Sequence, residues 1–250
     1  MHLWSSLRTQ YRQWRVRRKT QHFIRLAVTR GWTTARLPES SPLRRGRVLV
    51  LAAHVDDEAI GCGGTLLLHR QVNDPVHIVY VLEDPPRRQV REQEGDRIGK
   101  RLGATITHLR CSADSDAIVA ALRPILLHER PDVLYVPWAL DNHEGHLVVN
   151  YALGQLLQEG VECGELWCYE VWTPLIPNRI VDITDLMDQK QHLLQQYPSQ
   201  LATNDIVSMG LGLARYRGGF LSRKDAAAAE VFLALSSTEY RQLGQALAKK

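Results

Sequence analysis

Short apolar runs alternate with longer amphipathic stretches from residue 47 to residue 197, and this alternation most constrains the fold. We predict strands at 47–53, 76–82, 104–109, 132–138, 165–172 and 178–184, and helices at 58–72, 87–103, 115–129, 145–158 and 185–197. The strands are apolar throughout, which is typical of parallel strands covered by helices on both faces. The sequence therefore predicts an α/β class with a three-layer, Rossmann-like fold and a mostly parallel sheet.

Two residues inside this pattern have a predicted local role. Gly103 is expected to end the second helix, and Pro124 is expected to kink the third. Beyond Ser199 the pattern is less regular, and we expect a glycine-rich loop at 215–220 and a final helix. We predict a single domain at 47–250, preceded by a basic, partly amphipathic arm at 1–46.

The net charge of +4 conceals an uneven distribution. Residues 1–47 contain 12 Lys and Arg against one acidic residue, so the rest of the chain carries a net charge of −7. No basic face or zinc-finger spacing occurs in that acidic remainder, so we expect no nucleic-acid partner. Four cysteines without a CxxC pair favour a reducing, cytoplasmic location. The sequence has no uncharged apolar run of 18 residues, and arginines occupy the place of a secretory h-region.

The start of the chain combines aromatic and basic residues at helical spacing. Trp4, Leu7, Tyr11 and Trp14 recur every three or four positions, with arginines beside them. Such a helix can lie on an anionic lipid surface, so one hypothesis is peripheral membrane contact through residues 1–30. Packing of the arm on its own acidic domain or on a partner subunit is an equal alternative, and a mitochondrial transit peptide is a third. The oligomeric state is not legible from the sequence.

The stretch RVLVLAAHVDDEAIGCGG carries a cluster of ionisable residues directly after the first predicted strand. His54, Asp56 and Asp57 lie where ligands bind in open α/β sheets, outside the carboxyl ends of the strands. A divalent cation would offset the repulsion between the carboxylates. His54 and Asp57 could both bind one ion, at about 2.0–2.2 Å for zinc. Glu58 equally suits a helix N-terminus, where the dipole favours a carboxylate.

A second group of candidate ligands follows the fourth predicted strand, in LYVPWALDNHEGHLVVN. His143 and His146 would meet the first cluster in one crevice, which supplies the third ligand that catalytic zinc usually has. A dinucleotide site is a poor alternative, because the glycines at 61 and 63 do not complete the pattern GxGxxG.

Three motifs in this chain resemble those of the PIG-L/LmbE family, zinc-dependent deacetylases of N-acetylglucosamine-type substrates. AAHVDDEAIGCGGTL, at 52–66, resembles the signature AHPDDExxGxGGT. DNHEGH, at 141–146, resembles the segment DxHxDH, and REQEGDRIGKRLG, at 91–103, is similar to the family's R-E-x-E helix. With weaker segments near YEVWTPLIPNRIVDIT, KQHLLQQYPSQ and AEVF, the resemblance covers roughly 47–232.

The resemblance implies a metal site and a division of roles around it. It implies one zinc ion per chain, held by His54, Asp57 and His146, although these ligands also suit other divalent ions. It implies that Asp56 is the general base, and that His143 steadies the oxyanion or protonates the leaving amine.

Three further residues are candidate contacts of the substrate. Arg91 matches a family position associated with substrate contact. Trp138 could stack on a sugar ring, and buried packing is its alternative. Arg215, in the predicted glycine-rich loop, could bind a phosphate or carboxylate, and a solvated position is its alternative.

We therefore expect a zinc-dependent hydrolase that removes the N-acetyl group from an N-acetylglucosamine-type conjugate, a small molecule or a lipid-linked amino sugar. Gly145 stands where the family usually has Asp, and losing a carboxylate that orients a ligand costs about 10–100-fold in metal affinity or activity. Either Glu144 or another group replaces it, or the enzyme is slower. Val55 replaces a family Pro, and LEDPPRRQ replaces a Thr/Gly-containing loop. The alternative function is a catalytically degenerate member that serves as a sugar-binding or scaffolding subunit.

Overall fold

The structure is a computed structural model that describes residues 20–21, 23–25, 27, 41–222 and 227–248. Its regular elements between residues 41 and 248 are β1 (Val48–Ala52), α2 (Asp57–Gln71), β2 (Val76–Leu82), η1 (Pro85–Arg87), α3 (Arg88–Leu102), β3 (Thr105–Cys111), α4 (Ser115–Glu129), β4 (Val133–Pro137), α5 (Glu144–Gln158), β5 (Glu165–Tyr169), β6 (Arg179–Asp182), η2 (Thr184–Leu186), α6 (Met187–Leu194), α7 (Pro198–Leu201), α8 (Ile206–Gly218), β7 (Ala229–Leu235) and α9 (Ser237–Ala248).

The strands form one seven-stranded sheet in the order β3-β2-β1-β4-β5-β7-β6. The pairs from β3 to β5 are parallel, and β7 runs antiparallel to both β5 and β6. All five residues of β1 and all five of β4 are buried, as expected for central strands covered on both faces. The predicted α/β fold with a mostly parallel sheet is confirmed.

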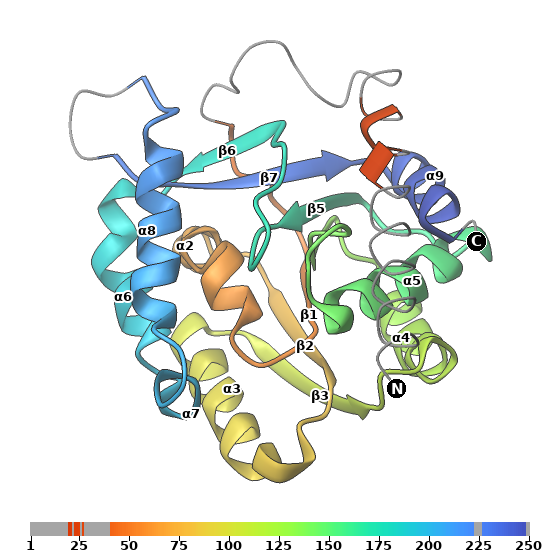
Figure 1. Ribbon diagram of the computed structural model, residues 1–250, viewed down its shortest axis with the longest axis horizontal. Coiled ribbons are helices and arrows are strands. Elements are labelled where there is room, and N and C mark those ends of the chain that lie inside the picture. Colours follow the sequence, from red (N-terminus) through yellow and green to blue (C-terminus); the bar gives the residue numbers. More distant parts are fainter. Residues whose placement is uncertain (1–19, 22, 26, 28–40, 223–226, 249–250) are drawn as a thin grey trace, which may run out of the picture.

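Helices cover the two faces of the sheet as separate layers (Figure 1). Alternate residues of β1 enter opposite cores, because successive side chains of a strand point to opposite faces. Leu49 and Leu51 pack in the core beneath α4, α5 and α9, whereas Val48 and Val50 pack in the core beneath α2, α3, α6 and α8. The layers make the three-layer arrangement that the apolar strands predicted.

The strand order reverses at β1. From β1 the chain moves outward to β2 and β3, then returns to place β4 on the other side of β1. Strands β1 and β4 are hydrogen-bonded neighbours, with Val48 opposite Val133. At such a switch point the connections after the two strands leave in opposite directions and open a crevice at their carboxyl ends.

Two elements after residue 199 differ from the sequence expectation. The expected loop at 215–220 is in part helical, because α8 continues to Gly218 and is held there by a buried ion pair between Arg217 and Glu170. The strand β7 was not predicted, since Glu230 interrupts its apolar run. Inside the protein that carboxylate is paired with Lys190 and accepts backbone N–H groups of α2.

Elsewhere the local predictions are largely correct. Gly103 follows α3 in the left-handed conformation, with φ +66°, as a helix-ending glycine often does. Helix α4 runs through Pro124 from Ser115 to Glu129, so the proline does not divide it.

Part of the predicted N-terminal arm contacts the domain. Phe23 and Ala27 are 2% and 1% exposed and belong to the core beneath α4 and α5, with the Phe23 ring 4.9 Å from that of Trp138. The aromatic residues at positions 4 to 14, on which the membrane hypothesis depends, lie outside the described residues. Among the described helices, none is long and apolar enough to cross a membrane.

The packing of α2 against the end of β5 can be tested with the substitution Gly61→Ala in α2. A Cβ at residue 61 would come within 2.5 Å of the Glu170 carbonyl oxygen and would also meet the Tyr169 ring. We expect a loss of about 1–3 kcal/mol in the free energy of unfolding, measured by urea denaturation. Gly212→Ala in α8 is the matched control, since its Cβ would meet nothing within 4 Å, and we expect it to gain about 0.5–1 kcal/mol. Equal losses in the two variants would contradict the contact.

Candidate active site

The first half of the site is the sharp turn from β1 into α2. The side chain of Asp57, the first residue of α2, turns back and accepts a hydrogen bond from the His54 backbone N–H at 2.8 Å. Between them Asp56 has φ +134° and ψ −26°, a conformation that side-chain-bearing residues rarely adopt. Asp56 and Asp57 are 5% and 2% exposed. The turn therefore places two carboxylates side by side in the interior.

The second half of the site is the turn from β4 into α5. His143 is the N-cap of α5, and its Nδ1 accepts a hydrogen bond from the Gly145 backbone N–H at 3.2 Å. His146 lies in the first turn of α5 and is fully buried. Because β4 neighbours β1, this turn brings both histidines to the turn after β1.

The two halves meet in a cluster of candidate metal ligands. His54, His143 and His146 present ring nitrogens that all lie within 4.8 Å of one another. Asp57 Oδ1 is 3.1 Å from His146 Nε2, and Asp57 Oδ2 is 3.7 Å from His54 Nδ1. The predicted ligands His54, Asp57 and His146 are thus brought together, and so is the predicted catalytic residue His143.

The spacing of these atoms suits a metal ion. Ligand atoms about 2.0–2.2 Å from a tetrahedral zinc ion stand roughly 3.3–3.5 Å apart, and the two distances to Asp57 lie on either side of that range. Two ligand sets are compatible with the cluster, because His54 and His146 can be completed by Asp57 or by His143. The first set has two imidazole nitrogens and one carboxylate, and the second has three imidazole nitrogens; both combinations occur in zinc sites.

A carboxylate that the sequence analysis did not single out supports His146. Asp141, 2% exposed, lies with Oδ2 3.1 Å from His146 Nδ1 and accepts a hydrogen bond from the Trp172 backbone N–H. A carboxylate in this position fixes the orientation and the basicity of a metal-binding histidine. Glu144, one of the groups considered as a replacement for the missing family Asp, is exposed to solvent. The signal for Asp141 was its place in the segment DNHEGH.

Gly145 has a steric reason in this structure. A Cβ at this position would lie 2.5 Å from His54 Cε1 and 2.9 Å from Leu82 Cδ1. Any side chain there, Asp included, would have to displace the His54 ring. The glycine therefore lets His54 lie against the N-terminus of α5.

Arg91 reaches the cluster from α3. Its Nη2 is 3.7 Å from Asp56 Oδ1, and its Nε is 4.0 Å from Asp84 Oδ2. The side chain is buried, and Nη1 has no hydrogen-bond partner among the described residues, at 4.0 Å from Glu94 Oε2. Arg91 thus offers an unused N–H donor beside Asp56.

A small cavity is lined on one side by His54. Its wall includes Arg91 together with Glu83, Asp84 and Arg88, which come from the sequence LEDPPRRQ. The loop that departs from the family pattern therefore borders the site.

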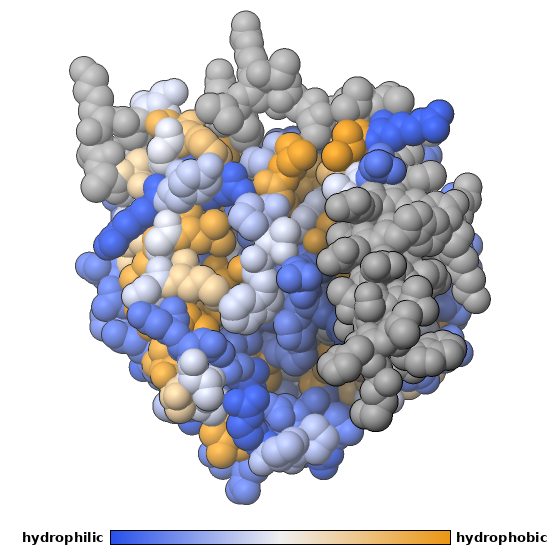
Figure 2. All heavy atoms as spheres, viewed as in Figure 1, coloured by the Kyte–Doolittle hydropathy of each residue, from blue (hydrophilic) through white to orange (hydrophobic). Residues whose placement is uncertain are grey.

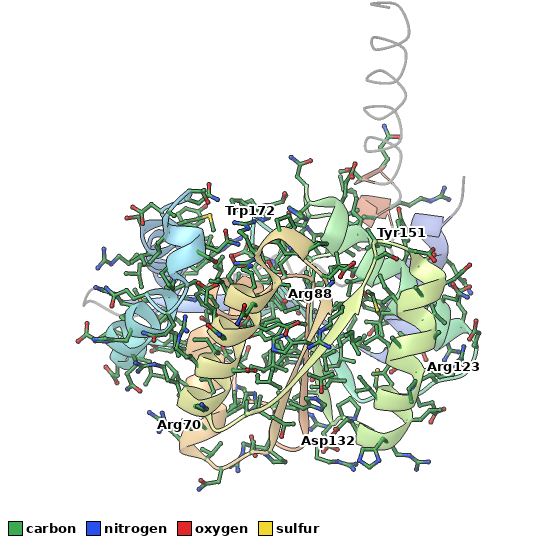
Figure 3. The ribbon with its side chains drawn as sticks, turned by 90° about the horizontal axis from the view of Figure 1, so that it is seen from below. Arg70, Arg88, Arg123, Asp132, Tyr151 and Trp172 are labelled. Carbon is green, nitrogen blue, oxygen red and sulfur yellow. The ribbon has the colours of Figure 1, made fainter. Side chains whose placement is uncertain are left out.

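The site lies on the carboxyl edge of the sheet. Trp172, which follows β5 and contacts Asp141, lies at the edge of the molecule opposite Arg70 and Asp132, which precede β2 and β4 (Figure 3). The face that carries this edge has hydrophilic residues over its middle and apolar residues over α2 and α8 (Figure 2).

The two remaining candidates are not part of the cluster. Trp138 is 3% exposed and packs against Phe23 in the core. Arg215 lies on the exposed surface of α8, next to Tyr216.

Asp56, Asp57 and His146 have strongly shifted pKa values. Burial and the charge of Asp57 raise the pKa of Asp56 well above its usual value, and Arg91 opposes this shift. Burial would raise the pKa of Asp57 too, but the charge and hydrogen bond of His146 hold it well below its usual range. Burial also opposes the charge on His146, yet Asp57 and Asp141 raise its pKa to about 10. The cluster therefore holds one anion and one cation as a buried pair.

The pKa of His143 shifts in the opposite direction. Burial and the neighbouring His54 and His146 lower it, which favours the neutral imidazole. Because Nδ1 accepts the Gly145 N–H, the neutral ring carries its proton on Nε2. His143 is thus set up as a hydrogen-bond donor.

Fold and cluster together define an α/β protein with a candidate metal centre at the switch point of its sheet. Residues 49–157 match the model of the family PIG-L, described as GlcNAc-PI de-N-acetylase. This match confirms the family resemblance that the motifs indicated, and it covers both turns of the site. None of the curated proteins compared with the chain matches it significantly.

Several solved structures share the fold. The conserved protein TT1542 from Thermus thermophilus is 24% identical, with a TM-score of 0.61 over 74% of this chain and 92% of that one. The N,N'-diacetylchitobiose deacetylase from Pyrococcus horikoshii is 21% identical, with a TM-score of 0.61 over 78% and 85%. GalB, the 4-carboxy-2-hydroxymuconate hydratase from Pseudomonas putida, is 19% identical, with a TM-score of 0.63 over 76% and 96%. These similarities show the fold alone.

The role of Asp141 can be tested with Asp141→Asn. We expect zinc affinity to fall about 10–100-fold, because the amide keeps the shape but loses the charge that supports His146. Competition with a chelator of known affinity measures the change. Glu144→Gln removes a charge from the same turn and should leave the affinity within about twofold, since exposed charges contribute little. A larger effect of Glu144→Gln than of Asp141→Asn would contradict this assignment.

Metal uptake should also release a proton. His146 has a pKa of about 10 in this arrangement, so a metal ion that binds its Nε2 at neutral pH must displace a proton. Affinity should therefore rise with pH between about 6 and 8. Calorimetry of zinc binding to chelator-treated protein, in two buffers of different ionisation enthalpy, measures the released protons. A heat that does not depend on the buffer would exclude His146 as a ligand.

Proposed function

We propose that this protein is a metal-dependent hydrolase that removes the N-acetyl group from an N-acetylglucosamine-type sugar conjugate. The observation that carries the proposal is the pair of adjacent buried carboxylates. Asp57 lies 3.1 Å from His146 and 3.7 Å from His54, whereas Asp56 faces Arg91 at 3.7 Å. A metal centre with a spare carboxylate beside it is one arrangement that supports hydrolysis of an amide, because it supplies both an activated water and a general base.

The comparisons support the same class of reaction. The matching family model is described as a GlcNAc-PI de-N-acetylase, and the Pyrococcus structure is described as a deacetylase of N,N'-diacetylchitobiose. Both descriptions name the removal of an N-acetyl group from an amino sugar. Because GalB has the same fold and is a hydratase, the substrate has to be tested directly.

We assign the metal site to His54, Asp57 and His146, with zinc as the first candidate. A bound zinc ion would lower the pKa of a water molecule and polarise the acyl carbonyl, two effects that overcome the stability of an amide. Asp141 would hold His146 in the ligand orientation from behind.

Asp56 is the proposed general base. A carboxylate that binds the metal is a weak base, so Asp57 as a ligand leaves Asp56 to accept the proton. Burial raises the pKa of Asp56, which brings its basicity closer to neutral pH, where general bases work best. Arg91, 3.7 Å away, orients this carboxylate and offers Nη1 to a substrate oxygen.

His143 is the proposed donor to the reacting carbonyl and the leaving amine. Its Nε2–H is the free end of a ring whose Nδ1 is fixed by the N-terminus of α5. A neutral donor of this kind can stabilise the oxygen on which charge develops and then give its proton to the departing nitrogen.

Two aspartate variants separate metal binding from catalysis. Asp56→Asn should reduce acetate release from N-acetylglucosamine conjugates by about 10²–10⁴-fold, because the general base is lost. It should leave the metal content of the purified protein unchanged. Asp57→Ala should lose both the bound metal and the release of acetate. Elemental analysis and an acetate assay on the same preparations measure the two.

The outcomes distinguish the alternatives. Unchanged acetate release by Asp56→Asn would exclude Asp56 as the general base. A wild-type protein that binds no metal would instead favour the sugar-binding or scaffolding subunit. A protein that binds metal but releases acetate from none of the conjugates would direct attention to other reactions of water, such as hydration.

A further inference from the structure

The carboxylate of Glu58 lies directly behind Asp56 and is completely buried. One oxygen, Oε1, accepts hydrogen bonds from the hydroxyl groups of Tyr80, at 2.7 Å, and Tyr197. The other oxygen, Oε2, accepts the backbone N–H of Asp56 at 3.3 Å. Burial raises the pKa of Glu58, and the two tyrosine hydroxyls act against that shift.

This arrangement differs from a carboxylate that merely suits a helix N-terminus. Such a side chain would face the free N–H groups of α2 and solvent, whereas Glu58 is bonded to β2 and to the segment after α6. Two hydroxyl donors from distant parts of the chain converge on a single oxygen. Burying a carboxylate is costly unless it is hydrogen-bonded or paired, so these donors offset a large desolvation penalty.

The residue that Glu58 restrains is the strained one. Asp56 holds φ at +134°, a conformation that costs about 1–3 kcal/mol for a residue with a side chain and persists only when its surroundings impose it. The hydrogen bond from its N–H to Glu58 is such a restraint. In this conformation Asp56 Oδ1 lies 3.7 Å from Arg91 Nη2.

The segment that contains Tyr197 also supports Arg91. Ser199, two residues after Tyr197, donates its backbone N–H and its hydroxyl to the two oxygens of Glu94, at 2.8 and 2.6 Å. Glu94 in turn faces Arg91, with Oε2 4.0 Å from Nη1. Tyr197, just before α7, and Ser199, inside α7, therefore reach Asp56 along two routes. Tyr197 acts through Glu58 on the Asp56 backbone, and Ser199 acts through Glu94 on Arg91.

We propose that Glu58 and Tyr197 are positioning residues for Asp56: Tyr197 fixes Glu58, and Glu58 holds the strained backbone that aims the Asp56 carboxylate. The proposal rests on the proposed function and deepens it, because it assigns a task in that reaction to a tyrosine 139 residues along the chain from Glu58. Neither residue touches the substrate, and both act through Asp56.

The test is Tyr197→Phe, which keeps the buried ring and removes one hydroxyl. We expect kcat for acetate release to fall about 10-fold, as loss of one hydrogen bond to a charged group would produce. The KM value and the metal content should stay within about twofold. Tyr135→Phe is the matched control, because it also removes a buried tyrosine hydroxyl, one that bonds His69, and its kcat should not change.

A second measurement does not depend on activity. Amide hydrogen exchange at Asp56, followed by NMR on the full chain, should be faster in Tyr197→Phe than in the wild type and unchanged in Tyr135→Phe. Unaltered exchange at Asp56 in Tyr197→Phe would overturn the proposal, even if kcat for acetate release falls in that variant. A wild type that releases no acetate but shows the faster exchange in the variant would refute the proposed function and keep the positioning role.

Glu58 itself is tested by rescue. Glu58→Ala should lower kcat more than Tyr197→Phe does, and Glu58→Gln should recover part of the loss, because its amide oxygen can still accept the Asp56 N–H. If Glu58→Ala does not fold, the comparison of Tyr197→Phe with Tyr135→Phe tests the proposal by itself. Equal losses of kcat in Tyr197→Phe and Tyr135→Phe would mean that the hydroxyls act only on stability, which would overturn the proposal.

Discussion

The protein buries three consecutive carboxylates, Asp56, Asp57 and Glu58, and like charges at that spacing repel one another strongly where water is excluded. The structure gives each a different partner. Asp57 is paired with His146, Asp56 faces Arg91, and Glu58 accepts two tyrosine hydroxyls. The partners come from α5, from α3, and from β2 together with the α6–α7 turn. Helices α3 and α5, strand β2 and the α6–α7 turn therefore all contribute a partner to the motif after β1.

The helix that carries these residues is itself held from the far side. Cys62 departs from helical geometry, with φ −140°, and the following N–H groups of Gly64 and Thr65 donate to Glu230 of β7. Lys190 balances that buried charge from α6. These hydrogen bonds tie the middle of α2 to the antiparallel end of the sheet, and loss of Lys190 would leave the Glu230 charge buried and unpaired. The strand β7, which breaks the parallel pattern, thus supports the helix that follows the site.

Much of the site was legible from the sequence because its parts are local. A turn of a few residues fixes the spacing of His54 and Asp57, and the parallel strands imply that His143 and His146 come to the same edge. Asp141 was not singled out, although it lies in the same segment, because nothing local shows that its carboxylate points to His146. The strand β7 was missed for a similar reason, because nothing local shows that Glu230 is paired with Lys190 inside the protein.

The sequence by itself determined the class of fold, the edge of the sheet that holds the site, and the residue types that meet there. These depend on apolar periodicity and on short-range geometry, which a linear pattern contains. Only the tertiary structure decided that Gly145 leaves room for His54 and that Trp138 is covered by Phe23. It alone decided that Tyr197 supports Glu58. Those facts depend on which side chains of distant segments share one volume, and no spacing along the chain specifies that.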